Sequence, residues 1–184
     1  MTAAGNGEAV GQVQAIAQVY GLQVADQGLL AVASLLRAIA QSVQRTFGRT
    51  IAVVVHGEVP HVLPEAESIP VALTLNELLT NAIKHGPGGE LRCELASEGE
   101  SITLRVVGAG RLPPGFDLAL IRSGVSGLGL VRALLPRRTS TLTLLQEGDS
   151  VVAQVHLRPP SVRWPSPGVR AISDNPRHDG SRQW

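Results

Sequence analysis

Four polar residues in one short stretch carry side chains that are suited to chemistry: Glu77, Asn81, Lys84 and His85. An α-helix turns about 100° per residue, so a helix over this stretch places all four within about a quarter-turn. An amide oxygen suits a hard cation, an ammonium suits phosphate, and a carboxylate can orient or deprotonate a nucleophile. Together they favour a site for a magnesium-bound nucleotide. A solvated helix face without function is the alternative that the spacing alone leaves open.

Two glycine motifs follow this stretch. Gly108 and Gly110 close a predicted strand, where missing side chains let a backbone approach a flat ligand. Ser126-Gly127-Leu128-Gly129-Leu130 opens a predicted helix, whose N–H groups and dipole favour phosphate. Neither motif is a dinucleotide fingerprint or a GxxxxGK[ST] phosphate loop, because no βαβ unit surrounds them and Lys84 follows no glycine loop. Their position after the polar helix strengthens the nucleotide interpretation.

The elements that must position these residues are helices and paired strands. Apolar spacing predicts helices over about 13–20, 29–47, 69–85 and 127–135. Alternating apolar residues predict strands over 51–56, 91–96, 102–107, 141–145 and 151–157, the last four forming two hairpins. This order predicts the α+β class, with a two-layer α/β sandwich: a mixed, mainly antiparallel sheet covered by helices and preceded by a helical segment.

The two N-terminal helices are each expected to bury one face. The face of the first is formed by Val13, Ile16, Ala17 and Tyr20. The second carries a longer apolar stripe, from Leu29 to Phe47. That stripe can pack on the first helix, on the following elements or on a second copy of itself.

Composition narrows the class of protein. The chain has 184 residues, 43% of them hydrophobic, a net charge of +1 and one cysteine, Cys93. A single cysteine excludes an intrachain disulfide framework and a cysteine-based zinc site. The near-neutral charge does not favour nucleic acid as a partner, and the apolar runs are shorter than the roughly 18–20 residues that span a bilayer. We therefore expect a soluble, cytoplasmic protein without nucleic acid partners and with no membrane segment in this chain.

At this point the motifs resemble a known family. Asn76-Glu77-Leu78-Leu79-Thr80-Asn81-Ala82-Ile83-Lys84-His85 resembles the N box of the GHKL (Bergerat-fold) ATPase domain of sensor histidine kinases, in a form similar to the HWE and related subfamilies. Gly108 and Gly110 lie where the G1 box belongs, and Gly127-Leu128-Gly129-Leu130 resembles the G2 box. The resemblance covers roughly residues 10–158.

The resemblance implies a set of roles. Its cofactors are ATP and Mg²⁺, with Asn81 coordinating the magnesium and Glu77 in the position of the catalytic base. Lys84 and His85 approach the phosphates, Gly108 and Gly110 belong to the nucleotide site, and Gly127, Leu128 and Gly129 cradle the phosphates. Residues 111–125 form the ATP lid. The partners that it implies are a second copy of the chain in a homodimer, a histidine phosphoacceptor domain and a response regulator.

It also implies a division of the chain. Residues 1–47 form a helical segment similar to the end of a dimerisation/phosphotransfer region, and residues 48–158 form the ATP-binding domain. Residues 159–184 are rich in Pro, Arg, Ser and Gly, and we expect them to be a disordered tail.

Two departures from the family pattern bear on function. The G1 box begins with an aspartate that accepts the adenine amino group, and Val106 occupies that position here; an unreplaced hydrogen bond costs on the order of 1–3 kcal/mol. No histidine precedes His56, so the usual phosphoacceptor is absent from this chain. The sequence thus predicts an ATP-binding catalytic domain that presents the γ-phosphate to a histidine elsewhere. The alternatives are a degenerate GHKL domain acting as a non-catalytic dimerisation or regulatory module, and an anti-sigma-type serine kinase.

Overall fold

A five-stranded sheet is the base of the fold, with strands in the order β2-β4-β5-β7-β6. The computed structural model describes residues 3–25, 30–122, 124 and 127–165. The five strands are β2 (Ala52–His56), β4 (Leu91–Glu98), β5 (Ser101–Ala109), β6 (Ser140–Glu147) and β7 (Ser150–Leu157). β2 pairs with β4 in parallel, and every other pair in this sheet is antiparallel. Two short strands, β1 (Leu30–Ala31) and β3 (Val62–Leu63), pair separately.

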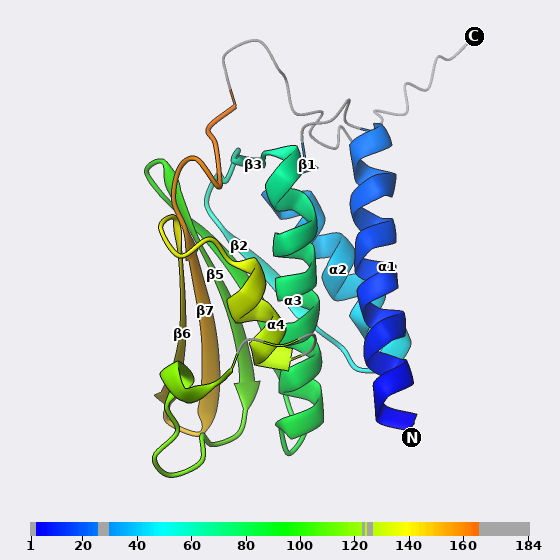
Figure 1. Ribbon diagram of the computed structural model, residues 1–184, viewed down its shortest axis with the longest axis vertical. Helices are drawn as coiled ribbons and strands as arrows, with labels where there is room; N and C mark the ends of the chain where they lie inside the picture. Colours follow the sequence, from blue (N-terminus) through cyan, green and yellow to red (C-terminus); the bar gives the residue numbers. More distant parts are fainter. Residues whose placement is uncertain (1–2, 26–29, 123, 125–126, 166–184) are drawn as a thin grey trace, which may run out of the picture.

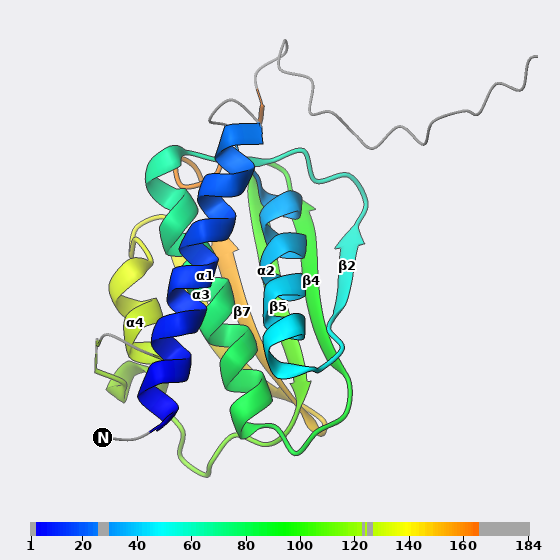
Figure 2. The ribbon, with the colours of Figure 1, turned by 90° about the vertical axis from the view of Figure 1, so that its right-hand side faces the viewer.

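Helices cover one face of this sheet in two tiers (Figure 1). The helices are α1 (Ala3–Ala25), α2 (Val32–Phe47), α3 (Glu65–His85) and α4 (Gly127–Leu134), and η1 (Leu118–Leu120) is a short 3-10 turn. α2, α3 and α4 lie against the sheet, while α1 lies across the outside of α2 and α3 (Figure 2). The expected α+β sandwich, with a mainly antiparallel sheet covered by helices and a helical segment at the N-terminus, is confirmed.

The predicted hairpins form with turns that glycine makes possible. Gly99 joins β4 to β5 and Gly148 joins β6 to β7, both with φ near +60°, a conformation that costs glycine little. The register places Val106 opposite Cys93 on one side and Ala153 on the other. All three are buried in the core beneath the helices.

The second helix buries most of its predicted stripe, although Phe47 at its end is 38% exposed and Leu29 lies outside the described residues. Its buried residues are Val32, Leu35, Leu36, Ile39, Ala40, Ser42 and Val43, and the helix ends at Gly48 in the left-handed conformation typical of a C-cap. Within the described residues this stripe packs on α1, α3 and the sheet. Of the three packing partners considered, the structure therefore shows the first two.

The first helix buries a different face from the one expected. Ala15 and Val19 are 1% and 0% exposed, whereas Val13 and Tyr20 are 66% and 58% exposed. Small residues decide this, because a Cβ atom added to Gly11 would lie 3.1 Å from Asn76 Nδ2 on α3. The side with the smallest residues allows the closest helix contact. The helix also runs from Ala3 to Ala25, through Gly21, and is longer than predicted.

Two element boundaries differ from the expectation. α3 begins at Glu65, earlier than the predicted start near residue 69, and Pro70 lies inside the helix. Part of the segment 159–165 packs on the fold, with Ser161 only 2% exposed, although we expected a disordered tail from residue 159 onward. Arg163 exchanges two backbone hydrogen bonds with Val62 of β3, and Val162 is fully buried. The rest of the expected tail, 166–184, lies outside the described residues.

Candidate functional site

Glu77 lies where three helices meet. Its side chain is 1% exposed, and both carboxylate oxygens accept hydrogen bonds. The backbone N–H of Gly127, the first residue of α4, donates to Oε2 at 2.9 Å across a sequence separation of 50 residues. The amide of Gln12 on α1 donates to Oε1 at 3.2 Å. The helix pattern alone placed Glu77 on a polar face open to a ligand, and the packing of α1 and α4 against α3 instead covers it.

Gln12 is a member of this site that the sequence did not identify. Gln12 follows Gly11, the residue of α1 that lies close to Asn76. It precedes Ala15 and Val19, which are buried on the inner face of the same helix. The signal available in the sequence is a polar residue beside small ones at helical spacing, Gly11 and Ala15. Such a position is easily overlooked because larger apolar residues mark the opposite face.

The other polar residues of α3 become more accessible toward its end. Asn81 is half-buried, and Lys84 and His85 are exposed. The structure thus keeps all four on one helix but separates Glu77, which is enclosed, from the last two. Gly86 ends the helix where no larger residue fits, because an added Cβ would lie 2.5 Å from the carbonyl oxygen of Ala82 and 2.9 Å from that of Ala109.

The first glycine motif packs against this end of α3. A Cβ on Gly108 would lie 3.4 Å from the Cβ of Ala82, so its missing side chain allows β5 to approach the helix. Gly110 has a φ of +150° and donates its N–H to the carbonyl of Asp149 at 2.9 Å. The motif and the helix end are therefore adjacent, as the nucleotide interpretation requires.

A cavity of about 510 Å³ opens at this junction. Its lining residues are His85, Gly86, Pro87, Ala109, Gly110, Arg111 and Asp149. The volume is within the range of small-molecule sites. Two of the predicted residues, His85 and Gly110, meet here, together with an ion pair that the sequence did not identify: Arg111 Nη2 lies 2.5 Å from Asp149 Oδ1. Both of these charged side chains are strongly exposed, so the pair contributes little to stability.

The second glycine motif forms the N-terminus of α4. Gly127 has a φ of +58°, and its N–H is the group that Glu77 binds. Gly129 has a packing role instead, because a Cβ there would lie 2.6 Å from the carbonyl oxygen of Arg122 in the preceding loop. Leu128 is half-buried and packs against the core. Gly127 is thus the member of this motif whose N–H faces a predicted site residue.

Val106 lies in apolar surroundings. It is 2% exposed and faces Cys93 and Ala153 across the two neighbouring strands. Burial raises the pKa of the Cys93 thiol to about 12, with a smaller contribution from the charge of Glu94. The core beneath α3 therefore disfavours a charged group. An aspartate at position 106 would enter that environment, and the native valine suits it.

The described residues contain no group of three or more His, Cys, Asp or Glu side chains that could hold a metal ion. They do not fit a metal cage built from protein alone. Mg²⁺ commonly keeps several waters and binds one or two protein oxygens together with substrate phosphates. The half-buried amide of Asn81 fits that second mode.

Solved structures with a similar fold include catalytic domains of histidine kinases. The histidine kinase domain of the blue-light activated kinase EL346 from Erythrobacter litoralis aligns with a TM-score of 0.63 and 20% identity, over 80% of this chain and 78% of that one. The nucleotide-free catalytic domain of histidine kinase ThkA aligns with a TM-score of 0.56 and 16% identity, over 70% and 95%. Histidine kinase ThkA in complex with response regulator protein TrrA aligns with a TM-score of 0.53 and 14% identity, over 66% of this chain and 37% of that one.

These likenesses establish the fold of the chain: it is the fold of histidine kinase catalytic domains. The sequence matches no protein-family model, and no curated protein is similar to it. Among the described residues, no helix combines the length and apolar character needed to cross a membrane.

Proposed function

We propose that this chain is the ATP-binding catalytic domain of a sensor histidine kinase. It would bind Mg-ATP and present the γ-phosphate to a histidine that this chain does not contain. The observation that carries the proposal is the hydrogen bond from Gly127 N–H to Glu77, which joins the N-box helix to the start of the second glycine motif. The two motifs that resemble the family therefore meet in space, within the fold of histidine kinase catalytic domains. The HWE subfamily is part of the proposal and rests on the form of the N box alone.

Each of the proposed site residues would have its own role in phosphoryl transfer, a reaction that depends on the positioning of the reactants and on electrostatics. Asn81 would hold Mg²⁺, which neutralises phosphate charge when it is bound. Lys84 and His85, at the exposed end of α3, would attract the phosphates. Glu77 would hold the proton of the acceptor imidazole while its nitrogen bonds to the γ-phosphorus and the bond to ADP breaks.

Nucleotide binding must change the contact that closes this site. A helix N-terminus favours a negatively charged group, and the carboxylate of Glu77 occupies that position at α4. A phosphate that is cradled by Gly127 would replace this carboxylate as the acceptor of the N–H. We therefore propose that ATP binding moves the start of α4 away from Glu77.

Calorimetric titration with Mg-ATP tests the proposal. We expect binding in the micromolar to millimolar range, a clear loss of affinity in Asn81→Ala, and weaker binding when magnesium is removed. Gln23→Ala serves as the control, because it also replaces an amide side chain by alanine but lies outside the proposed site, near the end of α1. If the folded chain binds no nucleotide at millimolar concentration, the catalytic proposal is wrong.

Val106 supports the second candidate, a degenerate domain that has lost adenine recognition and acts as a dimerisation or regulatory module. Val106→Asp separates the two candidates. A large gain in ATP affinity would show that the native site is impaired, while unchanged or weaker binding would show that recognition does not depend on this position. Because a buried carboxylate is costly, affinity is compared at a temperature where circular dichroism shows the variant to be folded.

The homodimer is also part of the proposal, with residues 1–47 as its helical segment and residues 48–158 as the ATP-binding domain. The support is an exposed apolar stripe on the outer side of α1, spaced by three and four as in a coiled-coil seam: Val10, Val13, Ala17, Tyr20 and Val24. We expect a dimer by light scattering and a monomer for Val13→Glu.

The remaining partners, a phosphoacceptor histidine and a response regulator, follow from the kinase proposal, and the ThkA complex contains such a regulator. A location in the cytoplasm also follows from the kinase proposal.

A further inference from the structure

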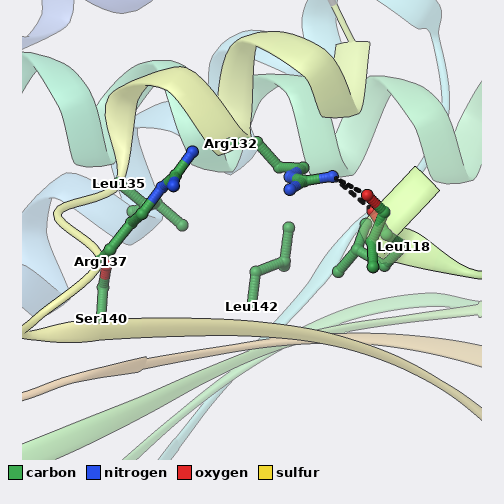
Figure 3. A pocket seen from close by; sticks show the side chains of 7 residues that line it. Leu118, Arg132, Leu135, Arg137, Ser140 and Leu142 are labelled. Atoms are coloured by element: carbon green, nitrogen blue, oxygen red, sulfur yellow. Dashed lines mark hydrogen bonds between the residues drawn. The ribbon is translucent and has the colours of Figure 1, made fainter. Parts of the chain in front are cut away.

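A second cavity, distinct from the one at His85, lies between α4, η1 and β6. Its volume is about 450 Å³. The main lining residues are Leu118, Arg132, Leu135, Arg137, Ser140 and Leu142 (Figure 3). Leu118 belongs to the segment 111–125 that resembles an ATP lid, and the other five belong to neither the polar face of α3 nor the two glycine motifs. The cavity is therefore separate from the residues proposed to hold Mg-ATP and needs an explanation of its own.

The side chains that line the cavity carry a net positive charge. Two arginines line the cavity, and none of its described lining residues is a carboxylate. The Arg137 side chain is exposed and has no hydrogen bond or ion pair to any residue that the structure describes. Arg132 donates its hydrogen bonds to backbone carbonyl oxygens, which are uncharged. Its positive charge is therefore not compensated by these partners.

Arg132 is held in place by the backbone of the preceding loop. Its Nη1 donates to the carbonyl oxygens of Leu118 and Ala119, at 2.8 Å each, and to that of Ile121. Figure 3 shows its guanidinium extended along the cavity toward Leu118. A guanidinium fixed in this way loses little further conformational freedom when a ligand binds.

The floor of the cavity is apolar. Leu142 rises from β6 into the space between the two arginines, and Leu135 lies beside Arg137 (Figure 3). Leu135 is 8% exposed. Small-molecule sites combine mostly apolar walls with a few placed polar groups, in volumes that include this one. Guanidinium groups also stack on aromatic rings.

We propose that this cavity is a binding site for a small organic anion with an apolar, preferably aromatic, body. The anionic group would pair with Arg137, and the body would lie on Leu135 and Leu142 between the two guanidinium groups. The proposal does not depend on nucleotide chemistry, because neither Asn81 nor Glu77 takes part.

The test uses three probes on the full chain without nucleotide: 2-naphthoate, uncharged 2-naphthamide, and acetate. Binding is measured by calorimetry and located by the NMR signals of the leucine methyl groups. We expect 2-naphthoate to bind more tightly than either other probe and to shift the signals of Leu135 and Leu142. Arg137→Gln should weaken it roughly three- to fivefold, as for an exposed charge pair. The neighbouring Arg138→Gln, which is exposed but does not line the cavity, should leave it unchanged.

A second variant keeps the test decisive if the charge effect is small. Ala119 lines the cavity and is itself exposed, so Ala119→Phe fills the space without entering the core. We expect it to abolish 2-naphthoate binding while the NMR spectrum stays that of a folded chain. The proposal is overturned if 2-naphthoate does not bind, binds no better than 2-naphthamide, shifts signals elsewhere, or binds Ala119→Phe as tightly as the native chain. ATP titration of the native chain tests the kinase proposal separately, because Ala119 lies in the segment 111–125 that resembles an ATP lid.

Discussion

The two ends of the nucleotide site proposed along α3 differ in their packing. At one end Glu77 is buried, and a helix on either side donates a hydrogen bond to its carboxylate. At the other end His85 is exposed and borders a cavity of about 510 Å³. A closed end resists substitution because its groups satisfy each other, while an open end can change its ligand contacts at little cost in stability. The difference predicts that variants at Glu77 act on folding and variants at His85 act on binding.

The largest expected effect concerns the core beneath both ends. Cys93 is buried, and the pKa of its thiol is raised to about 12 from an ordinary 9.0. Because the thiolate is the reactive form, we expect the native chain to react with a thiol reagent at pH 8 roughly 10³-fold more slowly than the unfolded chain.

The same shift gives a pH dependence. The folded state keeps the proton that the unfolded state loses above pH 9.0, so this contribution to stability is complete below that value and is lost as the pH rises through about 12. Reaction rates are compared with and without urea, and Cys93→Ala should show no such reaction at all. Rapid reaction of the native chain would mean that the reagent reaches Cys93, so that the core beneath Glu77 is not closed.

Removing the carboxylate at the closed end has the next largest effect. Glu77→Ala leaves the N–H of Gly127 and the amide of Gln12 without their acceptor, so we expect the free energy of unfolding to fall by about 2 kcal/mol. Urea denaturation measures it. Glu100→Ala, in the exposed turn between β4 and β5, is the matched control and should change stability by less than about 0.5 kcal/mol. Equal values for the two variants would remove the distinction between the ends.

A glycine of the same end gives a comparable but smaller loss. Gly129→Ala places a Cβ 2.6 Å from the backbone oxygen of Arg122, so the loop must move away from α4. We expect a loss of about 1–2 kcal/mol, within the range for overpacking. Gly21→Ala is the control, because nothing lies within 4 Å of that position in α1 and alanine there should stabilise the helix by up to about 1 kcal/mol. Thermal unfolding of both variants shows whether Gly129→Ala lowers the stability while Gly21→Ala raises it.

The sequence predicted the sheet and its helices better than it predicted the packing between helices. Strand alternation and glycine turns are local, and they gave both hairpins correctly. The face that α1 buries depends on how closely Gly11 approaches Asn76, which is a property of two helices and not of one. For the same reason the helix pattern placed Glu77 correctly among the polar residues of α3 but could not show that α1 and α4 cover it. The Arg111–Asp149 pair belonged to no pattern along the chain, and the only signal for Gln12 was its place beside the small residues Gly11 and Ala15.

The smallest effect on stability is expected at the open end. His85→Ala removes an exposed side chain at the edge of the cavity, so the free energy of unfolding should stay within about 0.5 kcal/mol of the native value. The same change should lower the affinity for Mg-ATP by roughly three- to tenfold, since one hydrogen bond to a charged phosphate is lost at a partly solvated site. His56→Ala, which is exposed at the end of β2, serves as the control for both measurements. A His85 variant that loses stability but keeps its affinity would show that both ends serve the fold, and that the nucleotide does not bind along this helix.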